Sequence, residues 1–341
     1  MSAIAGLDRD AAELQQRIER FQAVRAGILA QVRQVIVGQD DVLDQILIAL
    51  FVGGHCLITG MPGTAKTLMV RTIAQTLGLL FRRIQFTPDL MPSDITGTDI
   101  IEEDITTGRR KWTFVEGPIF GNVVLADEIN RTPPKTQAAM LEAMQERSCT
   151  VRGHVYQLPS PFFVLATQSP IELEGTYPLP EAQLDRFLFN SVLDYLSAAD
   201  EVKVVDLTTA TLNPQISAVT NADEILEFQQ LVRVVPIGES LAKYVVDLVR
   251  ATRHRSDNAP DFVKKYVNYG GSIRAAQFIV LAAKARALSR KRYHVTYEDI
   301  AALAVPVLRH RILLNFHAES ERIDSDEILT RLIEKMPRPK E

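Results

Sequence analysis

The chain has 341 residues, of which 46% are hydrophobic and 23% are charged, and 38 basic against 42 acidic side chains leave a net charge of −4. This length allows a large core and two domains, and the charge balance argues against a nucleic-acid or membrane-surface partner. Only two cysteines are present, and neither a leader peptide nor an apolar run near the roughly 20 residues of a membrane span is evident, so we expect a cytoplasmic protein.

The first predicted element is a long amphipathic helix over residues 9–35, because apolar residues recur there at three-, four- and seven-residue steps. We expect it to pack on the following domain or to cover a neighbouring subunit. Its apolar positions are Leu14, Ile18, Phe21, Ile28, Val32 and Val35.

A glycine-rich octapeptide, Gly60-Met-Pro-Gly-Thr-Ala-Lys-Thr67, follows the strand-like run 56–59 and precedes a helical pattern over 68–77. This order is the context of a phosphate-binding loop, where backbone N–H groups and the helix dipole attract phosphate. Lys66 should reach the β- and γ-phosphates, and the Thr67 hydroxyl should bind Mg²⁺. Ala65 replaces a usual Gly, which is tolerable if its φ is negative and strained if it is positive. An ordinary Gly/Pro turn is the alternative.

Two later segments have the alternation of β-hairpins. In the first, Ile100-Ile-Glu-Glu-Asp-Ile105 and Lys111-Trp-Thr-Phe-Val115 flank Thr106-Thr-Gly-Arg109. In the second, 149–152 and 154–158 flank Gly153. If both hairpins simply pack on the domain, Trp112 and Tyr156 are core residues.

The strand-like run 122–126 ends directly in Asp127-Glu128. An apolar strand that closes on two acids is the layout that holds Mg²⁺ and a hydrolytic water. Asp127 should bind the metal, and Glu128 should orient and deprotonate the attacking water. Either acid alone could be a solvated strand end, but the pair, following the phosphate loop, indicates a nucleoside triphosphatase.

Further strand patterns at 82–86, 162–167 and 187–192 alternate with helices, which predicts a parallel sheet covered on both faces. After about residue 196 the patterns become helical. We therefore expect an N-terminal helix over 1–35, an α/β domain over 36–195 and a helical domain over 196–341. The helices of that last domain are predicted at 198–207, 222–231, 240–252, 273–288, 297–307 and 326–334.

The chain resembles the MoxR-type AAA+ ATPases, ring-forming motors of the lineage that also holds magnesium chelatase and dynein-like subunits. The resemblance runs from Val35-Ile-Val-Gly-Gln-Asp40 to the last helices, and Ala65 is common in this family. It implies an α/β P-loop NTPase fold with a central parallel five-stranded sheet and a C-terminal all-α lid domain. The other segments on which the family resemblance rests are the octapeptide, Asp127-Glu-Ile-Asn-Arg-Thr-Pro-Pro134, Glu142-Ala-Met-Gln-Glu146 and Pro180-Glu-Ala-Gln-Leu-Asp-Arg-Phe187.

The resemblance also implies roles close to the nucleotide. Val37-Gly38 is similar to the segment that lies against the adenine. Ser169 stands where the family usually has a sensor Asn, and its shorter hydroxyl has one donor instead of two, so Gln168 could share that task. The residues implied to contact ATP are Val37, Gly38, Gly60, Met61, Pro62, Gly63, Thr64, Ala65, Lys66, Thr67, Leu68 and Asp127.

Two arginines resemble residues that act between subunits or domains, and a third is expected near the nucleotide of another subunit. Arg186 resembles the finger inserted into a neighbour's site, the alternative being a salt bridge with Asp185 or Glu181. Arg274 resembles the second sensor, which contacts the γ-phosphate from the lid, the alternative being an exposed helix charge. Arg131 is expected to face the nucleotide of an adjacent subunit.

The implied activity is Mg²⁺-dependent ATP hydrolysis by a hexameric ring that remodels, matures or activates protein complexes. The two hairpins resemble those that project from such rings and act on a protein client, and a partner with a von Willebrand factor A domain would be supplied in trans. One alternative is a nucleotide-gated binding module, for which Ser169 argues. Another is a DNA-acting ring, supported only by Arg109-Arg-Lys111 and Arg290-Lys-Arg292.

Overall fold

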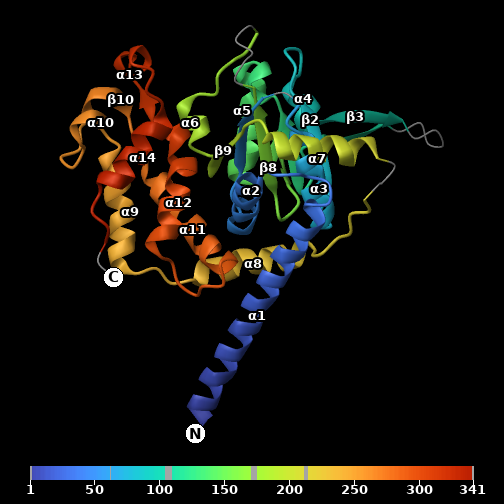
Figure 1. Ribbon diagram of the computed structural model, residues 1–341. Coiled ribbons are helices and arrows are strands. Elements are labelled where there is room, and N and C mark those ends of the chain that lie inside the picture. Colours follow the sequence, from blue (N-terminus) through green and yellow to red (C-terminus); the bar gives the residue numbers. More distant parts are fainter. Residues whose placement is uncertain (1, 62, 104–109, 170–174, 211–213, 340–341) are drawn as a thin grey trace.

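The computed structural model describes residues 2–61, 63–103, 110–169, 175–210 and 214–339, and their side chains except those of residues 2–12 and 111. Figure 1 shows a sheet with helices on both faces, a helical lid beside it, and a long N-terminal helix that extends away from the body. No helix in these described ranges has the length and apolar character needed to cross a membrane.

The central sheet has five strands in the order β2-β5-β8-β1-β9, and every neighbouring pair is parallel. This confirms the predicted sheet, with strand ends within two residues of expectation. Side chains alternate between two cores, so that Cys56 and Ile58 face one core and Leu57 faces the other. The strands are β1 Cys56–Gly60, β2 Phe81–Gln85, β5 Val123–Asp127, β8 Phe163–Gln168 and β9 Phe189–Leu193.

The N-terminal helix α1 (Ser2–Val32) confirms the predicted periodicity, because Ile18, Phe21, Ile28 and Val32 are buried. Leu14 is exposed, and the helix ends three residues before the predicted end, so that Val35 lies outside it and is half-buried. The second half is tied to the lid by an ion pair between Arg20 and Glu224 of α8 (Ala222–Val234). The other helices of the α/β domain are α2 Asp40–Val52, α3 Lys66–Thr76, α4 Pro92–Thr96, η1 Ile129–Arg131, α5 Pro134–Glu146 and α6 Glu181–Leu184.

The lid is helical, as predicted, and its core is continuous with that of one sheet face. A small antiparallel pair, β10 (Val267–Tyr269) with β11 (Leu313–Leu314), adds to the predicted helices. Strands of three and two residues are too short to show alternation in a sequence. The remaining helices are α7 Ala198–Thr209, α9 Glu239–Ala251, α10 Asp261–Tyr266, α11 Ile273–Ser289, α12 Tyr297–Leu308, η2 Arg309–Arg311, α13 Phe316–Ser320 and α14 Ser325–Lys335.

Both predicted hairpins are present, as β3 (Gly97–Glu103) with β4 (Arg110–Glu116) and β6 (Ser148–Val151) with β7 (His154–Gln157). The expected turn 106–109 lies outside the described residues. Trp112 is 56% exposed, which rules out a core role, and the Arg152 guanidinium lies 4.6 Å from its ring centroid. Tyr156 is half-buried and stacks on Phe114 with ring centroids 3.9 Å apart, so the two hairpins pack against each other.

Candidate nucleotide site

The octapeptide forms the loop between β1 and α3. A Cβ on Gly60 would lie 2.7 Å from the Leu193 carbonyl oxygen, so only Gly fits where β1 passes β9. Gly63 has φ +82°, and a Cβ on it would meet no atom of the described residues within 4 Å, which leaves open space above the loop. Ala65, the N-cap of α3, has φ 59° and ψ 23°, the left-handed conformation that is strained for Ala. Pro62 lies outside the described residues.

Lys66 begins α3 and turns back into the loop. Its Nζ donates to the carbonyl oxygens of Gly60 at 2.5 Å and Met61 at 3.2 Å. Partial burial lowers the pKa of Lys66, while the charges of Asp127 and Glu128 oppose that shift. The ammonium therefore lies within the electrostatic reach of both acids, in the position expected for a phosphate-binding lysine.

Strand order brings the loop and the acids together. β8 lies between β1 and β5, so the loop after β1 and Asp127 at the end of β5 flank the end of β8. Thr167 of β8 donates its hydroxyl to Asp127 Oδ1 at 2.6 Å and accepts the Glu128 N–H at 2.8 Å. The other carboxylate oxygen, Oδ2, accepts from Arg83 Nη2 at 2.7 Å and Nε at 3.1 Å. Asp127 is thus buried and held on both sides.

Glu128 has φ 58° and projects beyond the strand end. Its Oε2 accepts from Gln85 Nε2 at 2.8 Å and from Arg131 Nη1 at 3.0 Å. Arg131 therefore contacts the acid of its own subunit, and its expected position facing the nucleotide of an adjacent subunit stays a prediction. Arg83 and Gln85, both on β2, were missed from sequence, although their two-residue spacing places them on one face of a strand.

The end of β8 carries the candidate first sensor. Gln168 Nε2 donates to Thr59 Oγ1 at 2.8 Å, and Thr59 in turn donates to Asn190 Oδ1 at 2.8 Å. Ser169 Oγ is buried and has no hydrogen-bond partner among the described residues. The Ser169 hydroxyl therefore has no competing partner among the described residues, whereas Gln168 takes part in hydrogen bonds that connect β8, β1 and β9.

A cavity of about 330 Å³ lies beside the Val37-Gly38 segment, between the start of α2 and residues 192–200. Gly38 has φ +66°, and a Cβ there would lie 3.0 Å from the Leu196 side chain. Gln39 Nε2 donates to the Asp194 carbonyl oxygen at 2.9 Å and anchors the segment at the carboxyl edge of the sheet. This is the edge that also carries the phosphate loop, so the cavity is suitably placed for the base.

The donor set suits Mg²⁺. The Thr67 hydroxyl and the Asp127 carboxylate are hard oxygen donors, which this ion prefers, and it normally completes its shell with water and phosphate oxygens. Among the described residues no group of three His, Cys, Asp or Glu side chains could hold a metal without a ligand. Thr67 and Asp127 thus fit an ion that arrives with the nucleotide.

Arg186 and Arg274 lie at the opposite, amino-terminal edge of the sheet. Both line a cavity with Gly53, Gly54 and His55, the residues that precede β1. Arg186 Nη1 donates to the Leu141 carbonyl oxygen at 2.5 Å, and no ion pair to Asp185 or Glu181 is found among the described residues. A whole strand separates Arg274 from the loop of its own subunit, and its expected contact with a γ-phosphate stays a prediction.

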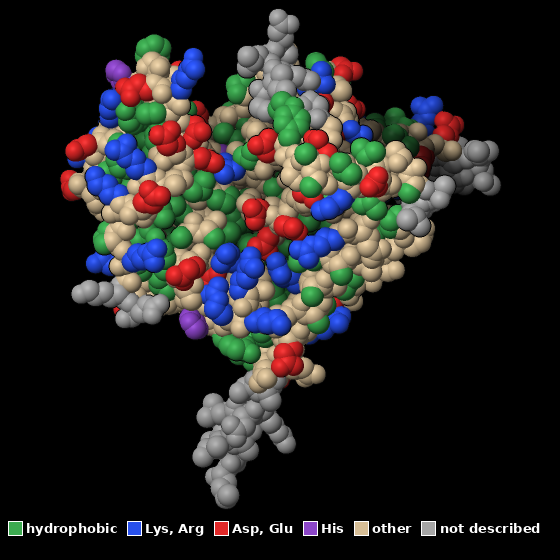
Figure 2. Space-filling view, in the orientation of Figure 1, with side chains coloured by type: hydrophobic (Ala, Val, Ile, Leu, Met, Phe, Trp, Pro, Cys, Tyr) green, Lys and Arg blue, Asp and Glu red, His purple; other side chains and the backbone are tan. Residues whose placement is uncertain are grey.

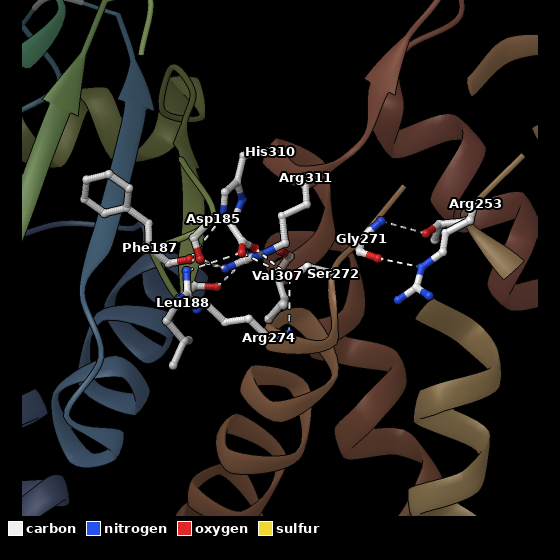
Figure 3. Close-up of polar contacts among 11 residues, drawn as sticks. Asp185, Phe187, Leu188, Arg253, Gly271, Ser272, Arg274, Val307, His310 and Arg311 are labelled. Carbon is white, nitrogen blue, oxygen red and sulfur yellow. Dashed lines mark hydrogen bonds and ion pairs between the residues drawn. The ribbon is translucent and has the colours of Figure 1, made fainter. Parts of the chain in front are cut away.

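Asp185 joins this edge to the lid (Figure 3). Its Oδ1 accepts from Arg311 Nε at 2.7 Å, and its Oδ2 accepts from Arg274 Nη1 at 3.4 Å. Ser272 Oγ donates to the same carboxylate at 3.0 Å. Burial lowers the pKa of Arg311 to about 10, and Asp185 opposes that shift. Arg274 is therefore oriented by a carboxylate next to Arg186, while its side chain remains 43% exposed.

On the face in Figure 2, several Lys and Arg side chains gather in the lower centre, next to Asp and Glu side chains. In the basic cluster 290–292, Arg290 pairs with Asp44 at 3.7 Å and Arg292 with the buried Asp299 at 2.6 Å. The charges of Arg290 and Arg292 are therefore partly neutralised by acids of the same protein, which does not favour a nucleic-acid-binding surface.

Comparison with known proteins finds related ATPases over most of the chain. Residues 55–189 match the ATPase family associated with various cellular activities (AAA), and residues 261–332 match the AAA lid domain. Chaperone MoxR1 of Mycobacterium tuberculosis is 41% identical over 309 residues, which are 91% of this chain and 81% of that protein. Protein MoxR of Paracoccus denitrificans is 30% identical over 310 residues, covering 86% and 89%. A crystal structure from Cytophaga hutchinsonii, of a protein assigned as an ATPase, has a TM-score of 0.88 and 40% identity, covering 98% of this chain and 99% of that one.

Proposed function

The chain belongs to the MoxR family of AAA+ ATPases, and we propose that it hydrolyses ATP with Mg²⁺ at sites shared between the subunits of a hexameric ring. The observation that carries this proposal is the separation of the site into two edges. Lys66, Asp127 and Glu128 lie at the carboxyl edge of the sheet, whereas Arg186 lies at the amino edge. A head-to-tail contact between copies brings the two edges together and closes into a ring.

In this account each subunit binds ATP between its loop and its acids. The loop N–H groups and Lys66 would hold the phosphates, and Thr67 and Asp127 would hold the ion, which would supply positive charge beside the transferred phosphoryl group. Glu128 takes a proton from the attacking water after leaving Gln85 and Arg131, and Ser169 is free to orient that water. Arg186 of the next subunit offsets the charge that develops on the γ-phosphate, an effect worth roughly 10³ or more in rate.

The coupled work is proposed to be chaperone-like remodelling of a protein client in the cytoplasm, aided by a von Willebrand factor A domain partner. The name of the mycobacterial relative supports the chaperone role. The paired hairpins support client contact, because Trp112, Ile101 and Val155 expose apolar surface of the kind that protein interfaces use. Trp112→Ala should then lower client-stimulated hydrolysis and leave the unstimulated rate unchanged.

The test is the ATPase rate per subunit as a function of protein concentration, with sizing in ATP. A shared site requires a rate that rises as rings form and disappears in Glu128→Gln, while that variant still assembles. Hydrolysis at full rate by a monomer would overturn the proposal.

A second candidate, a nucleotide-gated binding module, is favoured by one observation. Arg83 holds Asp127, while Gln85 and Arg131 hold Glu128, so both acids are engaged in contacts other than catalysis. If turnover is incidental, Glu128→Gln should support partner activation as well as the wild type does. If the protein is a motor, Glu128→Gln should bind the partner and fail to activate it.

A further inference from the structure

The cavity that contains Arg186 and Arg274 has a third guanidinium, that of Arg147. It measures about 190 Å³, and its other lining residues are Gly53, Gly54, His55, Met144, Gln145 and Phe278. None of these described lining residues is an acid. Three cations around one small cavity repel each other, so they are stabilised when an anion enters. Guanidinium groups are well suited to phosphate because their planar forks bind two oxygens at once.

Arg147 is held in place by its backbone. It is the C-cap of α5 with φ 53°, its N–H donates to the Ala143 carbonyl oxygen at 2.9 Å, and its own carbonyl oxygen accepts from Leu158 at 3.0 Å. A left-handed Arg persists only where such contacts fix it. Its Nη2 lies 3.4 Å from the Gly53 carbonyl oxygen, which keeps the side chain over the start of β1.

His55 forms the floor of the cavity and adds no charge to it. Its Nδ1 accepts the Val164 N–H at 3.0 Å, so its Nε2 must carry the proton that it donates to the Met144 carbonyl oxygen at 3.1 Å. Burial, and to a lesser extent the charge of Arg147, lowers the pKa of His55 to about 4. This neutral bridge fixes the end of α5, and hence Arg147, against the sheet.

We propose that Arg147 contacts the terminal phosphate of ATP bound to the loop of the adjacent copy, as a third cation beside Arg186 and Arg274. The cavity is thus an oxyanion site completed only in the ring, and this inference rests on the proposed function. Each cation has its own support: Arg274 is oriented by Asp185, Arg186 by the Leu141 carbonyl, and Arg147 by the end of α5. Three arginines held by different contacts therefore line one cavity.

The test uses Arg147→Asn, because Asn tolerates the left-handed backbone conformation. A second variant, Arg147→Lys, keeps the positive charge but lacks the planar guanidinium that can bind two oxygens. Arg322→Asn is the matched control, since Arg322 is also an exposed arginine with positive φ (57°) following a helix. At saturating ATP and protein, Arg147→Asn should reduce the rate about tenfold or more, Arg147→Lys less, and the control not at all. Circular dichroism and elution volume establish that each variant folds and assembles.

Mixing locates the defect. Arg147→Asn mixed with Glu128→Gln should recover activity, because an intact acid then meets an intact arginine edge. Mixed with Arg186→Ala it should not recover, since both variants damage the same edge. A normal rate for Arg147→Asn, or a loss that Glu128→Gln cannot complement, would overturn the inference.

Two further outcomes separate the alternatives. If Arg147 meets a carboxylate of the neighbour instead of phosphate, Arg147→Asn weakens assembly without nucleotide and keeps the full rate at saturating protein, which overturns the inference. If Arg186→Ala also leaves the rate unchanged, the shared site itself fails. Loss in Arg186→Ala with a normal Arg147→Asn refutes only the role of Arg147.

Discussion

Replacing the buried His55 by Gln should remove a large part of the acid sensitivity of this protein. Gln offers the same acceptor and donor for Val164 and Met144 but does not titrate. The folded pKa of His55 is lowered from 6.5 to about 4, so between these pH values the unfolded chain binds a proton that the folded chain does not. Stability contributed by His55 is therefore present above pH 6.5 and is lost as the pH falls toward 4.

The size follows from the two pKa values. At about 1.4 kcal/mol for each tenfold change in proton affinity, the difference amounts to about 3 kcal/mol of unfolding free energy at pH 4. The assay is urea unfolding, followed by circular dichroism, at pH values from 7 to 4. The wild type should lose about 3 kcal/mol more than His55→Gln over this range. His154→Gln, on the exposed strand β7, controls for the substitution and should retain the wild-type dependence. Identical pH dependence in wild type and His55→Gln would refute the assignment of a buried neutral imidazole.

Three further predictions concern the loop, the lid and the acids. Ala65→Gly removes the strain of a left-handed Ala and should raise the unfolding free energy by about 0.5–1 kcal/mol. Gly63→Ala should lower the unfolding free energy by about 1–2 kcal/mol. If urea titrations show that both variants change the unfolding free energy in the same direction, the loop geometry is contradicted. Asp299→Asn leaves the guanidinium groups of Arg286 and Arg292 without their buried carboxylate and should cost roughly 3 kcal/mol, so an unchanged urea midpoint would refute the buried network. Arg83→Ala frees Asp127 and should lower the Mg²⁺ concentration for half-maximal ATPase activity; a raised requirement would show that Arg83 assists the ion instead of competing with it.

The parts of the site that are contiguous in the chain could be predicted from sequence. The octapeptide and Asp127-Glu128 each combine a local pattern with a strand or helix, and the structure brings them together as expected. The roles of Arg83 and Gln85 could not be foreseen, because they depend on β2 lying beside β5, an order that no local pattern specifies. The position of Arg274 depends on how the lid docks through Asp185 and Arg311, contacts that join residues more than 80 positions apart.

Other differences have local causes. Sequence alone leaves the sign of the Ala65 φ open, and its positive value follows from the tight turn into α3. Trp112 is a candidate core residue from sequence because most aromatics are buried, yet it lies on a hairpin that extends from the sheet. Short elements such as β10 and β11 are stabilised by tertiary packing and leave almost no periodic signal.

The central claim is that two copies of the chain build each ATPase site. The most direct measurement mixes Glu128→Gln with Arg186→Ala, each inactive alone, and records the ATPase rate at ring-forming concentration. In random hexamers about a quarter of the interfaces join an intact acid to an intact arginine, so a clear fraction of wild-type activity should return. A mixture as inactive as its components, although both variants enter the same rings, would contradict the shared site.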